Sequence, residues 1–404
     1  MTKLLTILLF ICVFYSCRMN KKEKKENELS AVEQFSSPAK DSAAEPYLFT
    51  DSKGSVYLSW IEKNGPLSSF KFSTLENDKW SEPAVISTGN NWFVNWADYP
   101  MLTSDGTGNL IAHYLEKSGL SKYAYDVKIL SSGNNGKSWT AAKTLHDDGK
   151  QAEHGFVSMI PYNDNFFVSW LDGRNTGTEE SATGGHEGHH GQMSVRGAFI
   201  DKLGNKKDEW ELDNRVCDCC QTSAFITTNG PVVVYRDRSE NEIRDMSIVR
   251  YVNGKWTTPK IIFPDEWKIA GCPVNGPRAD AIGNHLAIAW FSKPDTIGQV
   301  NLIFSEDGGA NFKTPIRIDE GKAIGRVDVL MLDEKTAMVS WMEGTVIKAV
   351  KVGTDGTKQP AVIIASSSEA RSSGFPQMTR LGNKLFFAWT DDKERTIKMA
   401  SLIL

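Results

Sequence analysis

The segment FFVSWLD, Phe166 to Asp172, decides the fold, because its pattern recurs along the chain. It is an apolar strand that ends in an aromatic residue, usually followed by an apolar residue and a carboxylate. Six further segments share the pattern, namely SVYLSWIE at Trp60, LIAHYLE at Tyr114, PVVVYRD at Tyr235, LAIAWFS at Trp290, AMVSWME at Trp341 and LFFAWTD at Trp389. The aromatic residues stand 48 to 65 residues apart. Regular recurrence at this spacing is the mark of a repeat architecture.

Each repeat predicts about four short strands. A short strand and a turn rich in Gly, Asn or Asp precede the aromatic strand, which indicates a hairpin. Another apolar strand follows, such as MSVRGAFI at 193–200, and most repeats add a fourth, such as TPIRID at 314–319. Four strands in a unit of about 50 residues form a propeller blade. The sequence therefore predicts an all-β fold, a seven-bladed β-propeller spanning residues 31–404.

The two ends of the chain predict how the ring closes. The seventh repeat reaches Leu404 after three strands, and the segment around Val32 to Phe35 has no repeat of its own. We expect this N-terminal strand to complete the last blade. The repeated aromatic residues are expected to pack between blades.

Composition narrows the function classes. The 404 residues are 40% hydrophobic and 24% charged, which is typical of a globular chain and not of a disordered or polytopic membrane protein. Lys and Arg together number 46 against 50 Asp and Glu, for a net charge of −4. No basic surplus is present to neutralise a phosphate backbone, so we expect no nucleic-acid partner.

The N-terminus predicts export. Residues 1–17 combine a basic start with an apolar stretch too short to span a bilayer, as signal peptides do. Phe14-Tyr15-Ser16-Cys17 is similar to a bacterial lipobox, in which Cys17 would be acylated. Residues 18–30 are polar and rich in charge, as a tether would be. We expect a monomer in the bacterial cell envelope, attached to a membrane only through lipid; the alternative is an ordinary secretory signal.

Two turns carry a more specific pattern. SGNNGKSW at Ser132–Trp139 and SEDGGANF at Ser305–Phe312 occupy the same place in two repeats. Both resemble the Asp box, or BNR repeat, of the sialidase superfamily. The resemblance implies a sialidase-like propeller and a hairpin turn in which Asp or Asn binds backbone amides and Gly takes positive φ. It implies nothing about activity.

Strand alternation assigns the loops to two faces. We use the name loop-rich face for the one that carries the loops entering each blade and the loops following each aromatic strand. Propellers and sialidases bind ligands at this end of the central channel. Five arginines fall on it, and they are predicted to bind a small-molecule or glycan ligand that is polar or anionic: Arg174, Arg238, Arg278, Arg326 and Arg371.

The resemblance also implies a catalytic apparatus, which this chain matches poorly. Sialidases grip the substrate carboxylate with three arginines, the first in an Arg-Ile-Pro motif, and use a Tyr activated by a Glu together with an acid/base Asp. No Arg-Ile-Pro is present, and no Arg lies between Arg18 and Arg174. Acid/base candidates on the loop-rich face are Asp172, Asp237 and Glu343, with Asp98 and Asp328 as further choices. Ion pairs that brace the loops are the alternative role for these charges.

The cysteines are the most unusual feature. Four remain once Cys12 leaves with the signal and Cys17 is assigned to lipid: Cys217, Cys219, Cys220 and Cys272. The first three enter the fourth blade and the last enters the fifth, so the ring should make them neighbours. Two disulfides are one interpretation for an exported protein. The other is a copper or zinc site, with candidate ligands His186, His189 and His190 in the preceding repeat.

Two classes of function therefore remain open. One is an envelope lipoprotein that binds a glycan or a metal on its loop-rich face. The other is a sialidase-like glycoside hydrolase with a non-standard active site. The sequence leaves undecided whether the chain is an enzyme.

Overall fold

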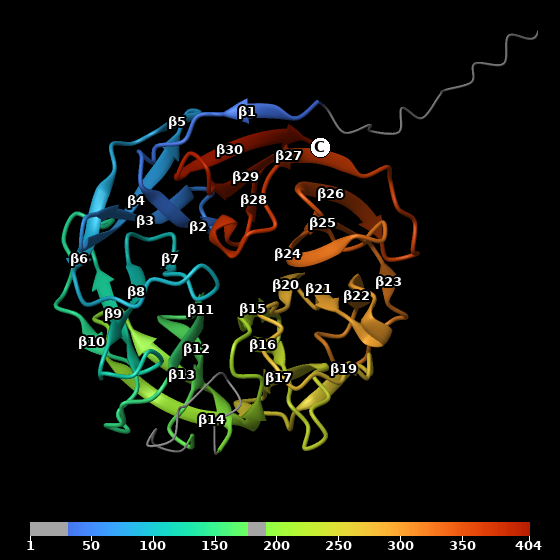
Figure 1. Ribbon diagram of the computed structural model, residues 1–404, viewed down its shortest axis with the longest axis horizontal. Helices are drawn as coiled ribbons and strands as arrows, with labels where there is room; N and C mark the ends of the chain where they lie inside the picture. Colours follow the sequence, from blue (N-terminus) through green and yellow to red (C-terminus); the bar gives the residue numbers. More distant parts are fainter. Residues whose placement is uncertain (1–30, 177–190) are drawn as a thin grey trace, which may run out of the picture.

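The computed structural model describes residues 31–176 and 191–404, and within them the fold is all-β. Seven antiparallel sheets surround a central axis in chain order, which confirms the predicted seven-bladed propeller (Figure 1). The only helical elements described are the 3₁₀ turns η2 (Pro294–Thr296) and η3 (Arg371–Ser373). Among the described residues, no helix has the length and apolar character needed to cross a bilayer.

In each blade the strand nearest the central axis comes first and the others follow it outward. Blade 1 holds β2 (Ala43–Thr50), β3 (Val56–Asn64), β4 (Leu67–Glu76), β5 (Lys79–Trp80) and β6 (Ala84–Gly89); blade 2 holds β7 (Leu102–Ser104), β8 (Leu110–Lys117), β9 (Tyr125–Ser132) and β10 (Lys143–Thr144). Blade 3 holds β11 (His154–Tyr162), β12 (Asn165–Asp172), β13 (Met193–Asp201) and β14 (Lys206–Val216); blade 4 holds β15 (Ser223–Thr227), β16 (Gly230–Arg236), β17 (Met246–Val252), β18 (Lys255–Trp256) and β19 (Lys260–Phe263).

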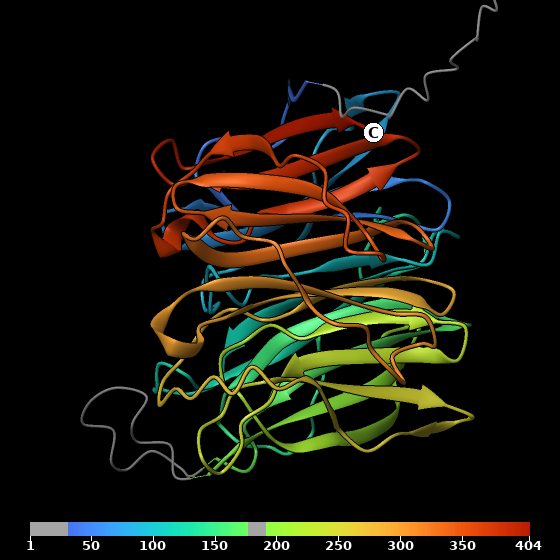
Figure 2. The same ribbon diagram turned by 90° about the vertical axis from the view of Figure 1, so that its right-hand side faces the viewer.

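The remaining blades complete the ring. Blade 5 holds β20 (Arg278–Ile282), β21 (His285–Ser292), β22 (Gln299–Ser305) and β23 (Ile316–Arg317); blade 6 holds β24 (Ala323–Asp333), β25 (Thr336–Glu343), β26 (Val346–Gly353) and β27 (Val362–Ser366). Blade 7 holds β28 (Gln377–Leu381), β29 (Lys384–Asp391), β30 (Thr396–Ile403) and β1 (Glu33–Phe35). Strands run between the two faces of the ring, so each loop lies on one face or the other (Figure 2).

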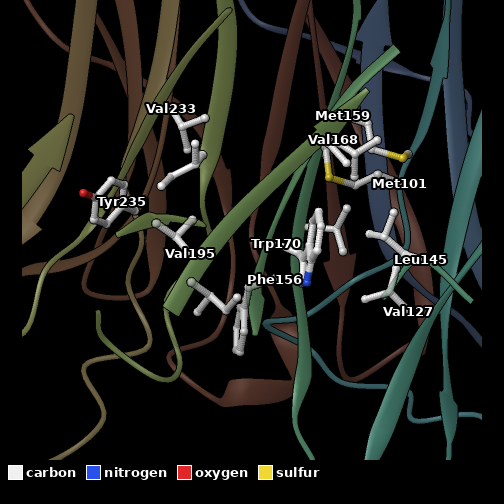
Figure 3. Packing of buried hydrophobic residues seen from close by; sticks show 14 of the residues in the cluster. Met101, Val127, Leu145, Phe156, Met159, Val168, Trp170, Val195, Val233 and Tyr235 are labelled. Atoms are coloured by element: carbon white, nitrogen blue, oxygen red, sulfur yellow. The ribbon is translucent and has the colours of Figure 1, made fainter. Parts of the chain in front are cut away.

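The aromatic residues that define the repeat pack between blades. Trp60, Trp170, Trp290 and Trp341 are all at most 1% exposed. Figure 3 shows Trp170 of β12 directed toward Val127 and Leu145 of the preceding blade, within one apolar cluster. Burial of such side chains between neighbouring sheets is the main contribution to cohesion of the ring.

The N-terminal strand closes the ring as predicted. β1 pairs antiparallel with β30, joining Glu33 to Ser401 and Phe35 to Met399. The two ends of the chain thus share one sheet (Figure 1).

Three carboxylates on or just before inner strands tie neighbouring blades together; Asp98 and Asp328 are buried, and Asp280 is partly exposed. Each accepts a backbone N–H from the next blade at 2.7 Å: Phe156 donates to Asp98, Met331 to Asp280, and Met378 to Asp328. Burial raises the pKa of Asp98 to about 7 and that of Asp280 to about 6. Asp98 and Asp328, two of the acid/base candidates, therefore have a structural role in the channel wall.

Candidate functional site

The four cysteines meet on the loop-rich face. Cys217, Cys219 and Cys220 lie between β14 and β15, where the chain enters blade 4, and Cys272 lies between β19 and β20, where it enters blade 5. The two loops that enter blades 4 and 5 approach each other closely, which Gly276 permits because it has no side chain. A Cβ placed there would stand 2.3 Å from the carbonyl oxygen of Gln221. The two entry loops therefore pack backbone against backbone beside the thiols.

The sulfur atoms form one cluster. The Sγ of Cys217 lies 3.5 Å from that of Cys220 and 4.0 Å from that of Cys219, and the three Sγ atoms lie within 4.8 Å of one another. Cys219 also interacts with the thiol of Cys272. Cys217, Cys219 and Cys220 are buried, Cys272 is partly exposed, and none of the four forms a disulfide in this structure. The ring therefore brings together all four residues that the sequence singled out.

Two guanidinium groups face the cluster. Arg244 donates to the Sγ of Cys217 at 3.2 Å, and the charge of Arg236 acts on Cys220. Arg236 is 1% exposed, and its hydrogen bonds go to the backbone carbonyl oxygens of Asn275, Arg244 and Phe291. The carboxylates of Asp245 and Asp265 also lie within electrostatic reach of Arg236, so its charge acts on them as well as on Cys220.

The thiols differ in acidity. Burial opposes ionisation of Cys220, but hydrogen bonds from Cys217 and Cys219 and the charge of Arg236 outweigh it, so the pKa of Cys220 falls well below its usual range. Burial raises the pKa of Cys217 to about 11 and that of Cys219 well above its usual range. Of the three buried thiols, Cys220 is therefore the one whose surroundings most favour the ionised form.

An acid–phenol group adjoins the cysteines. Tyr125 donates to Glu153 Oε1 at 2.8 Å and lies 3.3 Å from Asp98 Oδ2. Burial, with the charges of Asp98, Asp218 and Cys272, raises the pKa of Glu153 well above its usual range. The ring of Tyr125 is 1% exposed and is stacked against Phe93, with 4.1 Å between ring centroids.

The structure places the three predicted catalytic carboxylates in two kinds of environment. Asp172 accepts the indole N–H of Trp170 at 2.8 Å, and Glu343 accepts that of Trp341 at 2.7 Å. Both are buried, so this pairing gives them a structural role and explains the carboxylate of the repeat. Asp237 is partly exposed, and burial together with the charges of Asp213 and Asp245 raises its pKa to about 6.

The predicted ligand-binding arginines mostly have protein partners. Arg174 pairs with Asp172 and Glu209, and Arg238 pairs with Asp218 and Glu242. Arg326 is buried and donates to Ser373 and to the carbonyl oxygens of Glu369, Ala370 and Gly374. Arg278 donates to Tyr99 and Gln377, and Arg371 is exposed on η3. The pairing of Arg174 and Arg238 agrees with the loop-bracing alternative, and ligand binding by the five stays a prediction.

Some predicted site residues lie outside the described residues, and other members of the site were missed. His186, His189 and His190, like Cys17, belong to the first group. Sequence reasoning missed Arg236, Arg244, Tyr125 and Glu153 as members of the site. Arg236 carried a signal, because it ends the buried strand PVVVYR, where a charge needs a nearby partner.

Comparison with known proteins supports the fold. The sequence matches no family model and no curated protein. Among solved structures it is similar to a PL25 ulvan lyase, with a TM-score of 0.50 and 13% identity over 78% of this chain and 80% of that one. It is also similar to the K499G mutant of NanB sialidase from Streptococcus pneumoniae, with a TM-score of 0.47 and 8% identity over 92% of this chain and 94% of that one.

A third likeness is to the Hadza microbial sialidase Hz136, with a TM-score of 0.42, 13% identity and 74% of this chain covered. The present chain spans 63% of the length of that sialidase. Identities this low concern architecture alone. The chain is a seven-bladed β-propeller.

Proposed function

We propose that this protein is an exported, lipid-anchored propeller that binds one soft metal ion, Cu(I) or Zn(II), through Cys217, Cys219, Cys220 and Cys272. The observation that carries the proposal is the convergence of these four thiols, from two blades, beside two guanidinium groups.

The sulfur spacing suits shared coordination. Two sulfurs bound to one ion at about 2.3 Å each cannot be more than about 4.6 Å apart. The Cys217–Cys220 and Cys217–Cys219 separations, 3.5 and 4.0 Å, fall below that limit. Both exceed the bonded distance of a disulfide, about 2.05 Å. The cluster therefore supports the metal interpretation more directly than the disulfide one.

The charges around the cluster favour bound thiolates. Metal binding requires the ligand thiols to lose their protons, which creates several negative charges in a buried place. Arg236 and Arg244 already stand there, and Cys220 already favours its ionised form. Thiolate ligands select soft or borderline ions, which is why Cu(I) and Zn(II) are the candidates.

Export and anchoring rest on the first thirty residues. The basic start, the short apolar stretch and Cys17 support a lipid anchor, and residues 18–30 support a tether between the anchor and the propeller. An oxidising compartment would also threaten four thiols that form no disulfide, and a bound metal would protect them.

The test is metal analysis of protein purified without oxygen. We expect close to one equivalent of copper or zinc, and we expect Cys220→Ser to lose most of it. The matched control is Met331→Leu, which replaces a sulfur-containing residue buried in blade 6; this variant should keep the metal. Metal-free wild-type protein that also fails to take up Cu(I) or Zn(II) would overturn the proposal, and a Cys272–Cys219 disulfide found by mass spectrometry would replace it.

A second candidate, glycoside hydrolysis, is favoured by one observation. Tyr125 joins the carboxylates of Glu153 and Asp98 at the channel, so two acids and a phenol lie together. Sialosides and aryl glycosides should be offered to the same preparations. Hydrolysis that Glu153→Gln abolishes would favour this candidate, and inactivity toward both substrate classes would exclude it.

A further inference from the structure

A second set of ligand atoms lies between blades 2 and 3, and none of the four cysteines belongs to it. His146 and Asp148 follow β10, His154 begins β11, Asp126 lies on β9 and Asp172 ends β12. The two imidazole rings are stacked, with centroids 3.5 Å apart and planes 4° from parallel. Both histidines are buried, at 5% and 0% exposure.

The carboxylates surround the imidazole nitrogens. Asp148 reaches both rings, with Oδ1 2.7 Å from His146 Nδ1 and Oδ2 3.2 Å from His154 Nε2. Asp172 Oδ1 lies 3.8 Å from His154 Nε2, and Asp126 Oδ1 lies 3.4 Å from His146 Nε2.

Hydrogen bonds fix the tautomer of His154. Its Nδ1 lies 3.1 and 3.3 Å from the carbonyl oxygens of Ala152 and Tyr125. A carbonyl oxygen only accepts, so Nδ1 carries the proton, and in the neutral ring Nε2 presents a lone pair to Asp148 and Asp172. Metal-ligating histidines commonly take this arrangement, with one nitrogen donating to a carbonyl and the other binding the ion.

His146 also presents a nitrogen lone pair to a carboxylate. If Nδ1 donates to Asp148, the neutral ring turns the lone pair of Nε2 toward Asp126. This Nε2 is buried and makes no hydrogen bond. Lone pairs that face carboxylate oxygens repel unless a proton or a cation lies between them. Protonating both rings would place two positive charges in stacked rings 3.5 Å apart, which is unfavourable in a buried site.

The net charge of the surrounding side chains also favours a bound cation. Asp126, Asp148 and Asp172 supply three negative charges. Lys128 pairs with Asp126 at 3.1 Å and Arg174 pairs with Asp172 at 2.7 Å, which supplies two positive ones. With neutral histidines, three negative and two positive charges leave the group at −1, which attracts a cation.

A pocket gives access to the site. It has a volume of about 330 Å³, and its lining includes Asp126, His146 and Lys150. An entry path is one of the features expected of a functional metal site.

From these observations we infer a site for a divalent first-row transition metal ion, of the Zn²⁺ class, bound by His154, Asp148 and Asp172, with His146 and Asp126 beside them. Nitrogen and carboxylate oxygen suit this class of ion, in contrast to the sulfur ligands of the cysteine cluster. The bound ion links blade 2 to blade 3.

Co²⁺ is the probe that separates the two sites in one protein. Thiolate-bound Co²⁺ gives strong charge-transfer absorption in the near ultraviolet, whereas Co²⁺ bound by nitrogen and oxygen gives only weak visible bands. When Co²⁺ is added to wild-type protein, we expect weak visible bands whose saturation does not depend on any thiolate absorption. His154→Gln should weaken the affinity behind these bands on the order of tenfold or more, and it should leave thiolate absorption unchanged.

A second measurement keeps the test decisive if His154→Gln does not fold. Zn²⁺ should raise the melting temperature of wild-type protein, because an ion that binds only the folded state stabilises it. Asp148→Asn, in the loop after β10, should abolish the part of the Zn²⁺-dependent rise in melting temperature that does not depend on the cysteines. The control His285→Gln, a partly exposed histidine on β21, should retain it. Equal Co²⁺ affinity in wild type and both cluster variants, or thiolate absorption alone, would overturn the inference.

Discussion

Asp98 joins two neighbouring blades with a single carboxylate, which accepts the N–H of Phe156 with one oxygen and meets Tyr125 with the other. Burial raises the pKa of this group to about 7. The folded state therefore binds a proton here that the unfolded chain, with an ordinary Asp pKa near 4, releases at lower pH. Protonation of Asp98 thus couples the contact between blades 2 and 3 to pH.

The first prediction concerns this coupling. Because the pKa of Asp98 is raised on folding, its protonated form stabilises the fold below about pH 4, and that stability is lost as the pH rises toward 7. Asp98→Asn mimics the protonated side chain and should remove roughly 3 kcal/mol of this pH dependence between pH 5 and pH 8. Urea unfolding at pH 5 and pH 8 measures it, with exposed Asp41→Asn as control. Parallel stability losses in wild type and Asp98→Asn would contradict the prediction.

For single residues, the sequence predicted which side chains lie close together better than it predicted what each side chain does. Ring order alone placed Cys272 beside the Cys217–Cys220 segment, because neighbouring repeats become neighbouring blades. The role of Asp172 could not be predicted, since the same carboxylate that suits acid/base chemistry also satisfies the indole of Trp170. Only the geometry distinguishes these two uses.

Among the elements, the segment that enters blade 5 controls the cysteine cluster. Its Gly276 lies against the backbone of Gln221, the residue after Cys220. Gly271 lies in the same segment, yet the nearest heavy atom to a Cβ placed there would be 3.9 Å away. Neither glycine has positive φ, so they differ in packing and not in backbone strain.

The second prediction uses this pair. Gly276→Ala should destabilise the fold by about 1 to 3 kcal/mol, because the new methyl group must displace backbone. It should also reduce metal retention by separating Cys272 from Cys219. Gly271→Ala should change either property little. Thermal unfolding and metal content of the two variants provide the measurement; similar behaviour of both would show that the approach of the loops is not critical.

Turns of local origin were predictable, whereas contacts between elements were not. In the turn after β9, Asn134 Oδ1 accepts the N–H of Ser138 at 3.0 Å, Ser132 Oγ accepts that of Gly136, and Gly136 has φ of 76°. Each of these bonds spans four residues, so the sequence alone defines them. The Arg244–Cys217 contact joins two loops and depends on how they fold over blade 4.

For the whole molecule, the repeat explains why the fold was predictable. Seven recurrences and one unmatched N-terminal strand leave few architectures other than a closed ring. The site depends instead on the loops, whose lengths and contacts vary from blade to blade. Their chemistry could be recognised in the sequence, but their distances could not.

The third prediction concerns where the molecule resides. If Cys17 carries the lipid, Cys17→Ser should release a folded, exported protein into the soluble fraction. Fractionation of cells in high salt, followed by immunoblotting, measures this, and Cys12→Ser serves as control because that residue lies within the proposed signal peptide. Membrane association of Cys17→Ser that resists high salt would contradict a lipid anchor.

The closing strand then has a mechanical consequence. In an anchored molecule, tension on the tether enters the propeller at β1, which holds β30 through three paired residues. Phe35 fastens that strand, with its ring 5.1 Å from Phe386 and the ammonium of Lys384 4.9 Å from its centroid. Force from the envelope would peel this strand before it loads any other blade, so β1 would yield first and leave undisturbed blades 4 and 5, whose entry loops carry the four cysteines.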